Sequence, residues 1–249
     1  MIILGESVSG VCCQRLVSCG CAVVRFPSFS GLPRPVASHP DLLFFQLGDV
    51  LYTFPGVLPL ARSLLASYNG SIRAIPEEGG DVYPLDVPLS ALLLDGKLFG
   101  RTASLSAVLR QCGLPLIPVR QGYARCACAV IAPDAVITSD AGMARILRRE
   151  GIDVLTIRPG FLSLPGYDTG LIGGCGGLLP ASSVFPSVLS HDPSDPCPDP
   201  KRLFVWFGSL SSHPDGREMT CFAASHGTRF LSLSDEPLFD GGGLIVTDM

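Results

Sequence analysis

Four aspartates stand shortly before apolar stretches, in a chain of 249 residues of which only 16% are charged. They are Asp41, Asp86, Asp168 and Asp240. Carboxylates that converge can hold a planar guanidinium through paired hydrogen bonds. A buried cluster of carboxylates without a cation or a bound proton would be costly. Provided that the elements after them meet, these acids predict a site for a small cationic or zwitterionic ligand.

The composition predicts a folded cytoplasmic protein. Mean hydropathy is +0.41, which excludes disorder and predicts segments that are buried on both sides. No apolar run approaches the roughly 20 residues that span a bilayer, and the opening "MIILGESVSG" lacks the features of a signal peptide. A net charge of −4 offers no basic surface to nucleic acid. Neither a membrane nor a nucleic acid is an expected partner.

The ten cysteines predict buried, reduced thiols. They are scattered through apolar segments, in a chain large enough to fold without disulfides. The pairs at Cys12–Cys13, Cys19–Cys21 and Cys126–Cys128 lack the spacing of a zinc site, and only four histidines are present. The glycine-rich "GGCGG" is not followed by the lysine and helix of a phosphate-binding loop. No metal and no cofactor are expected.

One structural unit is clearest in "AVIAPDAVITSDAGMARILRREGIDVLTI". Two apolar runs flank a Pro-Asp turn, which predicts a hairpin. Ser139 is expected to cap a helix with an apolar face of Met143, Ile146 and Leu147. Gly151 then ends the helix, since glycine reaches the left-handed conformation without strain. The apolar "IDVLTI" follows as a strand buried on both faces.

The same order of hairpin, helix, glycine and strand recurs in the other parts of the chain. It begins at "LLFFQLGDVLYTF", "ALLLDGKLFG" and "RLFVWFG", and "MIILG" opens an N-terminal copy. The helix after the first of these is expected to bury Leu60, Leu64 and Leu65. The glycines expected to end the five helices are Gly20, Gly70, Gly113, Gly151 and Gly227. Internal repetition of this kind predicts a fold built from five ββαβ units.

The two ends of the chain complete each other in this scheme. The last strand, "GLIVTD", lacks a hairpin partner, and "MIILG" is an unpaired strand at the other end. Pairing them would close a five-fold ring without an exposed edge. The longest interval between units contains Pro180–Lys201, rich in Pro, Ser and Asp, which is expected to be an exposed hairpin insertion. We therefore expect a single α/β domain over residues 1–249.

Five ββαβ units in a ring resemble the pentein fold, the α/β propeller of the guanidino-group-modifying enzymes such as arginine deiminase and dimethylarginine dimethylaminohydrolase. The stretches "QGYARCACAVIAPDAVITSD", "IDVLTIRPGFLSLPGYDTGLIGGCGG" and "FLSLSDEPLFDGGGLIV" are similar to an uncharacterised bacterial family described only by this fold. In the catalytic members, the resemblance implies, residues entering each hairpin converge on the central axis. Carboxylates grip the guanidinium, a thiolate attacks its carbon and a histidine moves the proton.

The first two acids of that pattern have counterparts in this chain. Asp41, in "SHPDLLFF", stands where the first carboxylate belongs. Glu78 lies in a literal "EGGD", but extra residues separate it from the following hairpin. Asp86, in "YPLDVPLS", is closer to the hairpin and is the favoured second acid, with Glu78 as the alternative.

The remaining positions depart from the pattern. Where the third should read His-x-Asp, the chain has Arg125 and Cys126. The fourth unit brings Tyr167, Asp168 and Cys175 near its entry, beside glycines that would admit either a ligand or crowded strands. At the fifth, the position of the enzymes' cysteine falls on Val246, or on Ile245 or Thr247 one residue either way. Of these only Thr247 could act as a nucleophile, and the sequence shows no base to activate it.

Another thiol could replace the missing one. The resemblance brings both Cys126 and Cys175 near the axis, and Arg125 could lower the pKa of the Cys126 thiol. His39 is the one histidine it places nearby, whereas His213 and His226 flank the last helix and are expected to be solvated or capping. The weak catalytic candidates are therefore Cys126, Cys175 and His39.

Three hypotheses follow. The first is a protein that binds a small cationic, guanidino or amino-acid-like ligand without the ordinary deiminase chemistry, through Asp41, Asp86, Arg125, Tyr167, Asp168 and Asp240. The second is a guanidino-modifying hydrolase or transferase that uses Cys126 or Cys175. The third is a non-catalytic scaffold that docks a protein partner through Pro180–Lys201, where a tolerated loop insertion is the simpler interpretation.

Overall fold

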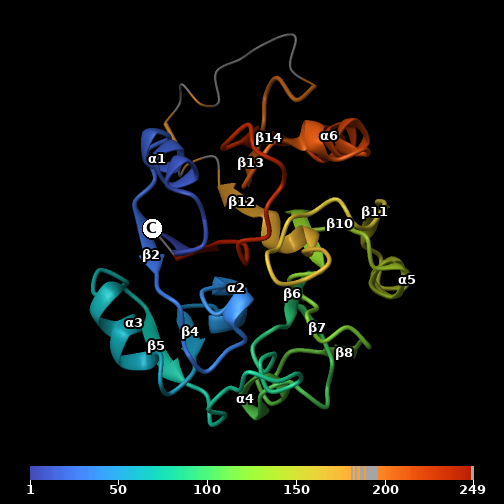
Figure 1. Ribbon diagram of the computed structural model, residues 1–249. Helices are drawn as coiled ribbons and strands as arrows, with labels where there is room; N and C mark the ends of the chain where they lie inside the picture. The colour runs from blue at the N-terminus through green and yellow to red at the C-terminus, as the bar shows by residue number, and fades with distance from the viewer. Residues whose placement is uncertain (181, 183, 186–187, 189–195, 248–249) are drawn as a thin grey trace.

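The computed structural model describes residues 1–180, 182, 184–185, 188 and 196–247. Within this part the chain forms five sheets of three strands each. Figure 1 shows the sheets around the middle of the molecule, with the longer helices on the outside. The predicted succession of strands and helices is confirmed along the chain.

The five sheets repeat one pairing scheme. The first contains β15 (Ile245–Val246), β1 (Ile2–Gly5) and β2 (Val23–Phe26), the second β3 (Phe44–Leu47), β4 (Val50–Thr53) and β5 (Ser71–Ala74), and the third β6 (Leu92–Leu94), β7 (Lys97–Gly100) and β8 (Leu116–Pro118). The fourth contains β9 (Cys128–Ala132), β10 (Ala135–Thr138) and β11 (Asp153–Thr156), and the fifth β12 (Gly176–Pro180), β13 (Arg202–Trp206) and β14 (Thr228–Ser232). In each, the middle strand is antiparallel to the first and parallel to the third. We call the first strand of each sheet its inner strand.

A helix connects the two parallel strands of every sheet, because a parallel pair needs a crossover. These helices are α1 (Gly10–Ser18), α3 (Leu58–Leu64), α4 (Ala107–Arg110), α5 (Ala141–Arg149) and α6 (Gly216–Ser225). The short α2 (Pro40–Leu43) instead leads directly into β3. Among the described residues, 3₁₀ turns also cover Arg34–Val36, Ile172–Cys175 and Leu210–Ser212. No helix in the described ranges is long and apolar enough to cross a membrane.

Local chemistry explains where the helices begin and end, with two corrections. The prediction that Ser139 caps α5 is wrong, because the Asp140 carboxylate accepts the bond from the Met143 amide, at 2.9 Å. Four of the five predicted terminal glycines have the left-handed conformation that ends a helix. Gly70 does not. A Cβ there would lie 2.1 Å from the Asp49 carbonyl oxygen, so close backbone approach requires the glycine instead.

The buried face of α3 also differs from the expectation. Leu60 is 40% exposed and Leu64 is 38% exposed, whereas Ala61 and Leu65 are buried. The helix therefore turns a narrower face to the core than its run of leucines indicates. Only the packing of α3 against its sheet selects which of two apolar rows is covered.

The ends of the chain meet in the first sheet. Ile2 pairs with Val246 and Ile3 with Ile245, in an antiparallel register. The Thr247 amide donates to the Met1 carbonyl at 2.9 Å, and the Thr247 hydroxyl donates to the same oxygen at 3.1 Å. The last strand of the chain thus supplies the inner strand of the first sheet.

The predicted insertion at Pro180–Lys201 connects β12 and β13, which are antiparallel and pair Pro180 with Arg202. Most of its central residues lie outside the described part of the chain. The prediction that this segment docks a protein partner therefore falls largely on residues outside the described part of the chain.

Candidate functional site

The residues before the inner strands form a buried polar cluster. Asp41 lies in α2 just before β3, and Asp240 lies in the loop that leads to β15. Their exposed fractions are 1% and 2%. The Asp41 amide donates to the Gly242 carbonyl at 3.1 Å, which ties the two segments together. The fold thus brings together two acids that are almost 200 residues apart in the sequence.

Asp41 has an unsatisfied carboxylate. Neither side-chain oxygen has a hydrogen-bond partner of ordinary geometry. The pKa of Asp41 is raised to about 7, first by burial and second by the nearby Asp240 carboxylate. The charge of Arg125 and the nearby Cys126 thiol act in the opposite direction, more weakly. Near neutral pH this carboxyl therefore exchanges between a buried charge and a bound proton.

Asp240 is better satisfied. One oxygen accepts from the Leu171 amide at 2.7 Å and the other from the Gly242 amide at 3.1 Å. Burial still raises the pKa of Asp240 to about 6, although both amides counteract it. The His39 ring nitrogen Nδ1 lies 3.8 Å from the Asp240 carboxylate. Above pH 6 Asp240 is therefore mainly an anion, held by backbone donors.

His39 does not supply the missing positive charge. Its ring is buried, its Nε2 has no hydrogen-bond partner, and burial lowers the pKa of His39 to about 4. The imidazole is therefore neutral at physiological pH. A neutral ring cannot balance the negative charge of Asp41 and Asp240.

The two candidate thiols lie in this cluster as thiols rather than thiolates. Cys126 and Cys175 are both buried. Burial raises the pKa of each well above its ordinary value, and Asp41 and Asp240 raise both further. The expectation that Arg125 gives Cys126 a lowered pKa is wrong, because burial and the two acids raise the pKa of this thiol. These thiols lack the electropositive, accessible surroundings of reactive cysteines.

A second acid lies beside this cluster. Asp86 is buried and accepts a short hydrogen bond from the Tyr123 hydroxyl, and its other oxygen has no partner. Burial raises the pKa of Asp86, although the bond from Tyr123 counteracts it. Burial, and to a smaller extent the Asp86 carboxylate, raises the pKa of Tyr167, which is 46% exposed. Glu78, the alternative second acid, is exposed.

Of the two other predicted ligand-binding residues, Asp168 lies apart from the buried acids, whereas the charge of Arg125 reaches Asp41. Asp168 is exposed, and among the described residues no hydrogen bond or ion pair joins its side chain to the cluster. Arg125 is half-buried, and its guanidinium donates to the Leu244 carbonyl at 3.2 Å. The fold therefore gathers Asp41, Asp240, His39, Cys126 and Cys175, with Asp86 and Tyr167 beside them.

Glycines make this packing possible. A Cβ at Gly242 would lie 2.4 Å from the His39 Cα, and one at Gly174 would lie 1.8 Å from an Asp240 oxygen. At Gly173 it would lie 2.5 Å from two carbonyl oxygens of the segment that leads into β9. The "GGCGG" glycines could admit either a ligand or crowded strands. The geometry favours the second role, since these glycines let backbone segments and the Asp240 side chain approach closely.

The sequence analysis missed Tyr123 and Ser90. The Ser90 hydroxyl lies 3.8 Å from the Cys126 sulfur, and Tyr123 holds Asp86. Their signal was position, because each lies in a segment that leads into an inner strand, as the predicted acids do. The described residues contain no group of three or more His, Cys, Asp or Glu side chains placed to hold a metal ion.

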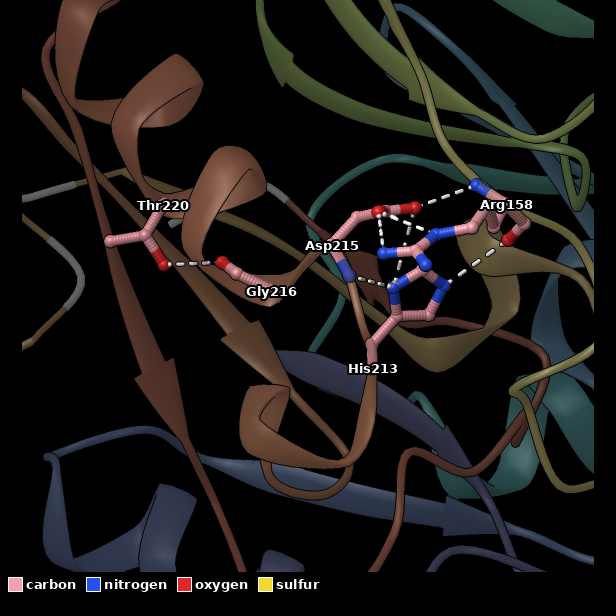
Figure 2. A network of polar contacts seen from close by, with 5 residues as sticks. All are labelled: Arg158, His213, Asp215, Gly216 and Thr220. Carbon is pink, nitrogen blue, oxygen red and sulfur yellow. Dashed lines mark hydrogen bonds and ion pairs between the residues drawn. The ribbon is translucent and has the colours of Figure 1, made fainter.

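A second polar network joins the fourth and fifth units (Figure 2). The Arg158 guanidinium donates to one Asp215 oxygen through Nε at 2.8 Å and Nη2 at 2.5 Å, and the Arg158 amide donates to the other at 2.7 Å. The Asp215 amide donates to the His213 ring at 3.1 Å. The expectation that His213 is solvated is wrong, since its ring is buried against this network. Its ring instead accepts a hydrogen bond from the amide of the residue that precedes α6, as the capping alternative allows. The network holds Arg158, at the start of the loop between β11 and β12. Later in the same loop, the Leu171 amide donates to the Asp240 carboxylate.

Comparisons with known proteins extend this picture. Residues 3–193 match the model of a family of unknown function, DUF6873. A comparison with curated proteins finds no match.

Two solved structures of dimethylarginine dimethylaminohydrolase cover nearly the whole chain. A histidine-to-glycine variant in an adduct with S-methyl-L-thiocitrulline has a TM-score of 0.54 at 9% identity, over 94% of this chain and 91% of that one. A cysteine-to-serine variant of the Pseudomonas aeruginosa enzyme, complexed with citrulline, has a TM-score of 0.55 at 10% identity, with the same coverage. The chain therefore has the fold of this enzyme. At such identity the likeness establishes the fold alone.

Proposed function

The chain belongs to DUF6873, a family of unknown function, and we propose that it binds a small cationic ligand of guanidino or amino-acid type. Asp41 and Asp240 form the centre of the site, with Asp86 beside them and Tyr167 at its rim. The ligand is bound without the thiol chemistry of the guanidino-modifying enzymes. Similarity of fold to an enzyme crystallised with citrulline supports this class of ligand.

The Asp41 carboxylate carries the proposal. An unpaired carboxylate in a protein interior costs several kcal/mol unless it takes up a proton or meets a cation. Neither Asp41 oxygen has a hydrogen-bond partner of ordinary geometry, and its histidine neighbour is neutral. The Cys126 thiol and the charge of Arg125 stabilise the carboxylate less than burial destabilises it. A cationic ligand would supply both the charge and the donors that the two oxygens lack. A guanidinium suits the site because its planar fork matches a carboxylate.

The absence of thiol chemistry follows from the same surroundings. A nucleophilic cysteine needs a lowered pKa and a nearby base. Burial raises the pKa of both Cys126 and Cys175. The Thr247 hydroxyl donates a hydrogen bond to the Met1 carbonyl. We therefore do not assign a nucleophile.

The proposed site requires the five units to surround one axis. We propose that the sheets are the blades of a closed propeller with five-fold pseudosymmetry. Two observations support it. The first and last strands pair, and a single cavity of about 430 Å³ is lined by the inner strands of all five sheets. Asp168, one of the predicted ligand-binding acids, has no role in this proposal.

Thermal unfolding with candidate ligands tests the proposal. The panel is arginine, agmatine, methylated arginines, creatine, dilute guanidinium and neutral amino acids, measured at pH 8, where Asp41 is mainly ionised. A ligand at about 100 times its Kd stabilises by roughly 2.7 kcal/mol, which raises Tm by several degrees. We expect a cationic member of the panel to do so.

Matched variants locate the binding site. Asp41→Asn should abolish the ligand-induced shift, measured against the ligand-free variant. Asp168→Asn, which removes an exposed acid of the same type, should leave it unchanged. A flat panel, or a shift that survives Asp41→Asn, would contradict the proposal.

A further inference from the structure

The cavity between the inner strands differs in character from the acid cluster. Its volume of about 430 Å³ is within the usual range for small-molecule sites. The five inner strands contribute Gln46, Leu93, Val130, Leu178 and Val246. Asp41, Asp86 and Asp240 precede the inner strands β3, β6 and β15 in the chain, so the cavity is lined by residues that follow these acids. It is lined mainly by apolar side chains and glycines.

One charged side chain enters this lining. Among the described residues that border the cavity, Arg125 alone is ionisable with a full charge at neutral pH. A guanidinium has five N–H donors. The described part of the chain gives Arg125 one acceptor, the Leu244 carbonyl at 3.2 Å, and no ion pair. Most of its donors are therefore available to a group within the cavity.

The surroundings of Arg125 favour an added anion. Gly243 separates the cavity from the acid cluster, and a Cβ there would lie 4.0 Å from an Asp41 oxygen. The charge of Arg125 lowers the pKa of Asp41, but burial raises it more strongly. The Asp41 carboxyl is therefore only partly ionised at neutral pH. Arg125 is thus a cation in a largely apolar cavity, with incomplete compensation from its neighbour.

We propose that this cavity is a second ligand site, which binds a small apolar monocarboxylate through Arg125. A single guanidinium pairs with one carboxylate in a bidentate arrangement. The apolar walls provide for an aliphatic or aromatic body. A phosphate is less suited, because no second cation lines the described cavity. The proposal relies on a different side chain and a different space from the cation site at Asp41, although the charge of Arg125 reaches that carboxyl.

Calorimetric titration of the full chain tests this site with four probes: hexanoate, benzoate, hexanamide and inorganic phosphate. We expect at least one carboxylate to bind and hexanamide, which has the same shape without the charge, to bind at least tenfold more weakly. Arg125→Gln should weaken carboxylate binding about 10- to 100-fold, as expected for a lost charge-assisted hydrogen-bond pair.

Two further variants decide the location, even where Arg125→Gln fails to fold. Leu93→Trp keeps Arg125 but fills the cavity from a strand position that is already 37% exposed, and it should abolish carboxylate binding. Asp41→Asn should retain it while losing the cation of the first site, which separates the two proposals. Equal binding of hexanoate and hexanamide, binding of phosphate alone, no binding of either carboxylate, or normal hexanoate binding by Leu93→Trp would each overturn the assignment.

Discussion

Asp41 and Asp215 both lie at the N-terminal end of a helix, yet the protein treats them in opposite ways. Asp215 accepts three hydrogen bonds from Arg158, which hold the pKa of Asp215 below its ordinary value. The Asp41 oxygens have no hydrogen-bond partner of ordinary geometry, and burial, with the Asp240 carboxylate, raises the pKa of Asp41 to about 7. Fully paired acids are ordinary parts of a stable structure, whereas an unpaired buried acid is the mark of a functional site. The contrast separates a structural region from a candidate site.

The largest expected effect is the pH dependence of Asp41→Asn. Because the folded-state pKa of Asp41 lies above its unfolded value of 3.8, Asp41 lowers stability progressively as pH rises from about 4 through 7. Asparagine removes this penalty. We expect the variant to gain about 4 kcal/mol relative to the parent between pH 4 and pH 8, from a difference of about three pKa units.

Chemical denaturation of both proteins at several pH values measures this gain. Asp168→Asn serves as the control for removal of an exposed acid and should track the parent. A variant that is less stable than the parent at pH 8 would show that the Asp41 carboxylate is satisfied, and the contrast with Asp215 would disappear.

A second, smaller effect concerns His39. Burial lowers the pKa of His39 to about 4, so its ring should stay neutral between pH 8 and pH 5. NMR of histidine-labelled protein follows the ring resonances, and the spectrum of His39→Gln assigns them. A ring that protonates above pH 6 would be an internal cation for Asp240, and the cluster would not need an external one.

The smallest effect is expected for Asp215→Asn. Since the pKa of Asp215 is lowered in the folded state, its contribution is present above the unfolded value and is lost as pH falls through the folded one. Much of Arg158 is exposed, so solvent screens the pair. We expect Tm to fall by roughly 2 °C at pH 7, and less in acid.

The sign of this change sharpens the comparison. At pH 8, Asp215→Asn should destabilise the protein and Asp41→Asn should stabilise it, and both differences should shrink in acid. Differential scanning calorimetry at two pH values provides the measurement. Equal signs for the two variants would mean that the hydrogen bonds of Asp215 do not distinguish it from Asp41.

Much of the fold could be predicted because its signals are local. The hairpin between β6 and β7 turns at Asp95 and Gly96, both left-handed, as a two-residue turn of this kind requires. Gly151 ends α5 in the same conformation. Where the prediction failed, two neighbouring residues offered similar local chemistry. Ser139 and Asp140 can both cap α5, and α3 carries two apolar rows.

The candidate site was predictable in part. Asp41, Asp86 and Asp240 were identified by their places before the inner strands, and all three are buried. Asp168 occupies a similar place but is exposed. The role of Tyr123 could not be predicted from its place before an inner strand alone, since its partner Asp86 is 37 residues away.

The sequence by itself determined the order of strands and helices, the turns and the residues at the entry of each unit. These depend on propensities and on hydrogen bonds between neighbours along the chain. The tertiary structure alone decided which acids are paired, which are charged, and which glycines separate crowded backbones. A carboxylate's pKa depends on water excluded by distant segments, and that exclusion exists only after the five sheets have packed together.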